Sequence, residues 1–79
     1  MTGDEFNTRL QDLMAPQMFV IGRGGEEAED NLSSLVCALS VALAAYCRTN
    51  PEKLDEMCIS MEFRLRDMAR SFQEVLSKN

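Results

Sequence analysis

Residues 32–47 read LSSLVCALSVALAAYC and form the most apolar stretch of this 79-residue chain. After Ser34 the stretch contains one polar residue, Ser40, so no single apolar stripe separates a buried side from an exposed side. A helix that is apolar all round is either buried on all sides or embedded in a membrane. Sixteen residues with three serines fall short of the about 20 apolar residues that a bilayer span needs. The stretch therefore predicts the buried central helix of a small helical protein, with no membrane association.

The length and the cysteine content narrow the class of protein. Seventy-nine residues allow one domain, and so short a chain buries only about 60% of its unfolded surface, which leaves a marginal core. The three cysteines, Cys37, Cys47 and Cys58, lie among apolar residues and are predicted to be small buried hydrophobes in a reducing cytoplasm. Because the chain has no histidine and no close cysteine pair, we expect neither a metal nor a cofactor. The acidic, polar start of the chain does not resemble a signal peptide, which again favours the cytoplasm.

The negative charge is concentrated near the N-terminus. Residues 1–31 contain seven acidic residues and two arginines, a net charge of −5, whereas residues 32–79 contain six acidic and six basic residues. An acidic region of this kind is repelled by nucleic acid and anionic lipid and is attracted to basic protein surfaces. The charge pattern predicts a basic protein partner and no direct binding of nucleic acid.

The first helix is expected over residues 3–14. Thr2 and Glu5 have the spacing of a capping box, and acidic residues in the first turn favour a helix N-terminus. Apolar residues then recur at helical spacing up to Met14. Pro16 disfavours the helical conformation of the residue before it, so we expect an end or a kink there.

Residues 17–21 carry four large apolar side chains and leave two alternatives open. They form either one more helical turn, which the spacing of Met14, Met18 and Ile21 favours, or a short extended segment. The glycines of residues 22–25 then predict a break in the chain. Acidic residues follow this break directly and would repel a phosphate, so we interpret it as a connector and not as a phosphate-binding loop.

Two longer helices are expected over residues 26–48 and 51–76. Asn50 and Pro51 suit the N-cap and first position of the second of them. Each helix carries apolar residues in heptad steps, and in residues 51–76 these steps cover three full heptads. The members of these two seams are Leu32, Val36, Leu39, Leu43 and Tyr46, and Leu54, Cys58, Met61, Leu65, Met68, Phe72 and Val75. A short connection between helices of matched length predicts an all-α fold, an antiparallel helical hairpin with the shorter N-terminal helix packed on it.

No arrangement of residues indicates catalysis. The serines have no visible base, and a protein of two or three helices rarely offers a concave site for paired carboxylates. We therefore expect a protein that is not an enzyme.

Apolar residues beside the acidic segment predict a protein-binding surface. Apolar anchors next to a charged rim are typical of such surfaces, and methionine adapts to different partners. The predicted partner-binding residues are Met14, Met18, Phe19, Ile21, Glu26, Glu27, Glu29 and Asp30. The alternative for Phe19 and its neighbours is that they close the core.

Two functions are compatible with these features. The first is a small acidic regulator that inhibits or sequesters a basic partner, such as a transcriptional activator or another nucleic-acid-binding protein. The second is a dimeric helical hairpin that serves as a structural, assembly or chaperone subunit, with acidic residues that only keep it soluble.

Overall fold

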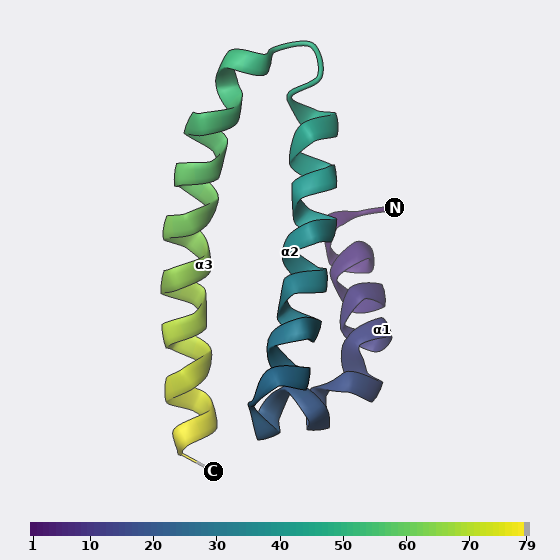
Figure 1. The fold of residues 1–79 in the computed structure, drawn as a ribbon, viewed down its shortest axis with the longest axis vertical. Helices are drawn as coiled ribbons and strands as arrows, with labels where there is room; N and C mark the ends of the chain where they lie inside the picture. Colours follow the sequence, from purple (N-terminus) through teal and green to yellow (C-terminus); the bar gives the residue numbers. More distant parts are fainter. Residues whose placement is uncertain (79) are drawn as a thin grey trace. The chain divides into compact units, whose positions relative to one another are not determined.

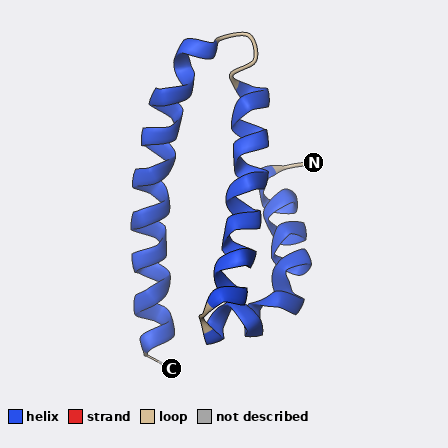
Figure 2. Cartoon of the chain, in the orientation of Figure 1, coloured by secondary structure: helices blue, strands red, loops and turns tan. Residues whose placement is uncertain are grey.

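The computed structural model describes residues 1–78, and these residues are helical almost throughout, without β-strands (Figure 2). The elements are α1 (Gly3–Arg23), α2 (Glu26–Tyr46), the short 3-10 helix η1 (Pro51–Lys53) and α3 (Leu54–Ser77) (Figure 1). The prediction of an all-α protein is confirmed. The chain divides into two compact units, residues 1–39 and residues from Ser40 onward, and the division falls within α2.

The start of α1 follows the sequence closely. Thr2 is the N-cap, and its hydroxyl oxygen accepts a hydrogen bond of 3.2 Å from the backbone N–H of Glu5. The backbone N–H of Phe6 donates to the carbonyl of Thr2 at 3.0 Å, which closes the first turn. Asp4 and Glu5 lie in this turn, where their charges favour the helix N-terminus.

The predicted end of the first helix at residue 14 is wrong, because α1 continues through Pro16 to Arg23. Proline removes one helical hydrogen bond, which would otherwise join its own nitrogen to the carbonyl of Asp12. Asp12 and Pro16 are both exposed, so water can reach that carbonyl and the missing bond is tolerated. Residues 17–21 are accordingly helical, which resolves the alternative left open by their sequence.

Two glycines end α1 and allow the chain to enter α2. Gly24 and Gly25 have φ angles of 72° and 88°, which non-glycine residues rarely adopt. The N–H of Gly24 donates to the carbonyl of Ile21 at 3.1 Å, and the N–H of Glu29 donates to the carbonyl of Gly25 at 3.0 Å. The predicted break at residues 22–25 is therefore confined to Gly24 and Gly25.

The connection to α3 is also more detailed than predicted. α2 ends at Tyr46, two residues earlier than expected, and Pro51 opens η1, from which α3 begins at Leu54. Asn50 contributes no side-chain cap; its backbone carbonyl accepts a hydrogen bond of 3.0 Å from the N–H of Lys53. On α3 the side chains of Glu62 and Arg66, four residues apart, form an ion pair at 2.8 Å, the one ion pair among residues 1–78.

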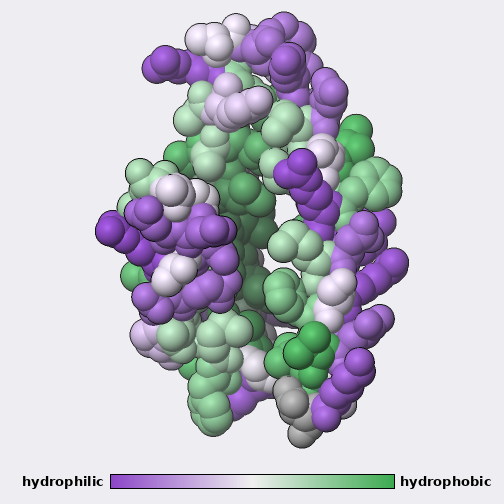
Figure 3. Space-filling view, turned by 180° about the vertical axis from the view of Figure 1, so that it is seen from behind, coloured by the Kyte–Doolittle hydropathy of each residue, from purple (hydrophilic) through white to green (hydrophobic). Residues whose placement is uncertain are grey.

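The expectation that α2 is buried on all sides is wrong for the structure described. Ala28 is the one buried residue of α2, and Leu39 and Val41 are 44% and 66% exposed. Hydrophobic residues accordingly lie open on the surface beside charged ones (Figure 3). The apolar pattern of α2 indicates which residues prefer to leave water, and Leu39 and Val41 are among those that remain exposed.

Burial is concentrated where helices connect. In residues 1–39 the buried side chain is Ala28, close to the glycine connection, and in the second unit it is Cys47, in the turn after α2. Cys47 is thus a small buried hydrophobe as predicted, whereas the same prediction is wrong for Cys37 and Cys58, which are exposed. All three thiols are free.

Candidate functional site

The structure separates the apolar residues predicted for partner binding into two groups. Met14 and Ile21 are half-buried and line a cavity of about 190 Å³ between α1 and the first part of α2. Met18 and Phe19 are more exposed, at 49% and 74%, and do not line it. All four residues lie in the first compact unit.

The cavity is formed by one face of α1 and one face of α2. Its lining residues are Leu13, Met14, Gln17 and Ile21 from α1, and Asn31, Ser34 and Leu35 from α2. The positions on α1 recur at intervals of three or four residues, so they share one side of the helix. A continuous α1 is therefore a condition for this cavity, because a helix that ended at residue 14 would not present Gln17 and Ile21 beside Met14.

The polar residues on the α2 side are held by their own helix. The side-chain N–H of Asn31 donates to the backbone carbonyl of Glu27 at 2.7 Å, and the hydroxyl of Ser34 donates to the carbonyl of Asp30 at 3.2 Å. These hydrogen bonds run along α2 and do not cross the cavity. The apolar side chains of Leu13, Met14 and Leu35 remain available to a ligand.

The acidic residues predicted for partner binding lie at the start of α2. Glu26, Glu27, Glu29 and Asp30 are all exposed, and the first three belong to the first turn. Glu27 and Asp30 each precede a cavity-lining residue by four positions, which is about 6 Å along the helix axis. Glu27 and Asp30 therefore lie one helical turn before cavity-lining residues of α2 and do not line the cavity themselves.

The two compact units differ in charge. Residues 1–39 contain seven acidic residues and two arginines, a net charge of −5, and residues 40–79 contain six acidic and six basic residues. All the net charge of the protein thus belongs to the unit that contains the cavity. The sequence revealed this asymmetry, and the structure adds that it coincides with a structural division.

Arg23 lies over the exposed face of Phe19. The central guanidinium carbon is 5.0 Å from the centre of the ring, a distance typical of a cation–π interaction. Phe19 thus contacts a guanidinium near the end of α1 while its side chain stays 74% exposed.

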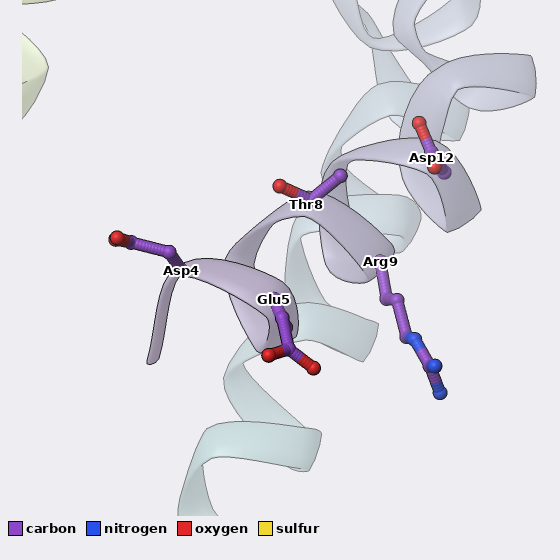
Figure 4. Close-up of a pocket in the computed structure, with 5 residues that line it drawn as sticks. All are labelled: Asp4, Glu5, Thr8, Arg9 and Asp12. Carbon is purple, nitrogen blue, oxygen red and sulfur yellow. The ribbon is translucent and has the colours of Figure 1, made fainter. Parts of the chain in front are cut away.

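A second recess lies on the N-terminal half of α1, and its carboxylates do not gather at one point. Its residues are Asp4, Glu5, Thr8, Arg9 and Asp12. Figure 4 shows that the three carboxylates point in different directions along the helix and do not converge on one point. Among residues 1–78 there is no group of three or more histidine, cysteine, aspartate or glutamate residues placed to hold a metal ion.

No pattern in the sequence predicts that the lining residues of α1 and α2 form a cavity. Gln17, Asn31 and Ser34 are polar and carry no motif, and the sequence does not distinguish Leu13 and Leu35 from the other apolar residues of the helices. The available signal was the spacing of Leu13, Gln17 and Ile21, which is helical only if Pro16 is accepted inside the helix.

Comparison with protein family models gives no match, and comparisons with curated proteins and with solved structures give none either. Of the helices described, α2 alone is long and apolar enough to cross a membrane by length and composition, with a mean hydropathy of 1.2. Core helices of soluble proteins and signal sequences meet the same criteria.

Proposed function

We propose that this protein is a small acidic regulator without enzymatic activity that binds a basic protein partner through its first compact unit. The partner class that fits best is a transcriptional activator or another nucleic-acid-binding protein, which the regulator inhibits or sequesters. The observation that carries this proposal is the coincidence of the whole net charge of −5 with exposed or half-exposed apolar side chains in residues 1–39. Apolar anchors surrounded by charge are typical of protein-binding surfaces.

The same proposal places the protein in the cytoplasm and does not insert it into a membrane. Four of the first five residues of α2 are acidic, which leaves sixteen residues up to Tyr46. These span about 24 Å, less than the about 30 Å of a hydrocarbon core. Direct binding of nucleic acid is disfavoured as well, because residues 1–39 would repel its phosphates.

We also propose the finer arrangement of the fold, an antiparallel hairpin of α2 and α3 with α1 packed on it. The two helices have 21 and 24 residues, and a short turn with η1 joins them. Helices of matched length with a short connection pack as antiparallel neighbours.

The experiment that tests the function compares two charge-reversed baits in affinity capture from the native host. Glu26, Glu27 and Asp30 are changed to Lys in one bait, and Glu56, Asp67 and Glu74 in the control. Both changes alter the net charge equally, but only the first acts on residues 1–39. We expect a partner that is retained by the wild type and by the control, lost from the first bait, and released as salt rises. A partner retained equally by both baits would contradict the proposal.

A second function is favoured by the exposure of α3. Its seam residues Leu65, Phe72 and Val75 are 66%, 61% and 59% exposed, and no residue of α3 is buried. A surface of this kind suits a dimeric hairpin in a structural, assembly or chaperone role. A solution mass twice that of the 8.9 kDa chain, unchanged by salt, would favour this function.

A further inference from the structure

We propose that the cavity between α1 and α2 receives one large apolar side chain of a basic peptide segment. This inference rests on the proposed function and assigns the place on the surface where the partner is anchored. In this inference the anchor contacts Leu13, Met14 and Leu35. The basic side chains around the anchor contact the acidic residues at the start of α2.

The volume of the cavity is close to that of one large apolar side chain. Sites for cofactors and other small molecules usually have volumes of about 300–1,000 Å³, which exceeds the 190 Å³ found here. An apolar cavity of about 150 Å³ is already large enough for a benzene ring. The space between α1 and α2 therefore matches one phenylalanine, leucine or methionine side chain better than it matches a cofactor.

The lining of the cavity also favours an apolar anchor. Asn31 uses one of its two amide N–H groups, and Ser34 its hydroxyl hydrogen, in hydrogen bonds to the backbone of α2, which leaves fewer donors for a polar ligand. Leu13 is 77% exposed and Leu35 37% exposed, and both lose contact with water when an apolar side chain enters.

Charge complementarity favours basic residues on both sides of the anchor. Glu27 and Asp30 lie one helical turn from Asn31 and Ser34, about 6 Å along the axis. This separation is shorter than the Debye length of about 8 Å at physiological ionic strength, so the carboxylates still attract a charge at the cavity rim. Lysine or arginine residues beside the anchor would meet these carboxylates, whereas acidic residues would be repelled.

The cavity can be filled without a change in charge. Ser34→Leu places an apolar side chain in the cavity and removes one exposed hydrogen bond. The matched control is Ser33→Leu, the same change at an exposed neighbouring position that does not line the cavity. Both changes replace serine by a better helix former, so circular dichroism should show intact helices in both variants.

The probes are labelled helical peptides of alanine and lysine, one with a central phenylalanine and one with alanine in its place. We expect wild-type protein and Ser33→Leu to bind the phenylalanine peptide at least tenfold more tightly than the alanine peptide, by fluorescence anisotropy at physiological salt. We expect Ser34→Leu to bind both peptides with the weaker affinity. A third peptide, with glutamate in place of lysine, should not bind.

Three results would overturn the inference. Equal binding of the phenylalanine and alanine peptides by the wild type would show that charge acts without an anchor site. Undiminished preference of Ser34→Leu for phenylalanine would place the anchor elsewhere, and absence of any binding by the wild type would remove the site altogether. The proposed function would survive any of these results if charge reversal still abolished capture of the native partner, so the two failures are distinguishable.

Discussion

The guanidinium of Arg23 lies over the ring of Phe19, with its central carbon 5.0 Å from the ring centre. This pair occupies the last two turns of α1, next to the glycines that connect α1 to α2. Arg23 also lies in the last turn of α1, where a positive charge interacts favourably with the helix dipole. The arrangement leaves a large aromatic ring open to water a few residues before the acidic start of α2.

The first prediction concerns this ring. Phe19→Ala should change the melting temperature little, because the ring is 74% exposed and an exposed cation–π contact contributes only about 0.5–1 kcal/mol. If Phe19 is an anchor for the partner, its loss should weaken binding by about 2 kcal/mol, roughly 30-fold in Kd. Phe63→Ala is the control, since Phe63 is similarly exposed in the second unit. A large drop in melting temperature for Phe19→Ala would instead identify a core residue.

The second prediction concerns the two prolines. Pro16 lies inside α1, where proline costs about 3 kcal/mol relative to alanine, so Pro16→Ala should stabilise the protein by about 1–3 kcal/mol in urea unfolding. Pro51 opens η1, a position that suits proline, so Pro51→Ala should be neutral or destabilising by less than about 1 kcal/mol. Destabilisation by Pro16→Ala would indicate that the native chain does not continue as a helix through residue 16.

The sequence predicted local structure better than it predicted burial. The cap at Thr2, the glycine break before Glu26 and the boundary at Pro51 depend on neighbouring residues, and each is found close to its expected place. The continuation of α1 past Pro16 depends on whether the carbonyl of Asp12 is open to water. Such exposure is a property of the folded chain that the residues around Pro16 do not encode.

Burial could not be read from the periodicity for a related reason. The pattern of α2 shows that Leu39 and Val41 are apolar and lie on different sides of the helix, but a pattern cannot state what covers each side. The same limit applies to the exposed Cys37 and Cys58, whose apolar neighbours suggested burial. The cavity requires a match between α1 and α2 that no local motif describes.

The third prediction tests the proposed hairpin. Leu39 belongs to the α2 seam that would face α3, whereas Val41 lies off that seam. If the hairpin forms, Leu39→Asp places an unpaired charge in the interface and should cost about 3 kcal/mol, whereas Val41→Asp should cost less than about 1 kcal/mol. Chemical unfolding followed by circular dichroism measures both. Equal, small effects would show that the seams do not pack against each other.

The last prediction separates the roles of charge and apolar contact in binding. Exposed charges act mainly on the rate of encounter, because they attract a partner before contact, whereas buried apolar anchors act on the lifetime of the complex. Changing Glu26, Glu27 and Asp30 to Lys should therefore lower the association rate for the lysine–phenylalanine peptide by at least tenfold at low salt, and the difference from the wild type should shrink as salt rises. The melting temperature should fall only slightly, since the lost interaction of these residues with the helix dipole is worth about 1 kcal/mol.

Ser34→Leu should show the opposite pattern, with an association rate within about twofold of the wild type and a dissociation rate raised at least tenfold, because the encounter is unchanged and the anchor is excluded. Stopped-flow fluorescence with the same peptide measures both rates, and Ser33→Leu provides the baseline for an added leucine on α2. If the charge-reversed protein associates as fast as the wild type at low salt, acidity is not the means by which this chain finds its partner. If both variants change only the association rate, the cavity contributes to attraction and does not hold an anchor.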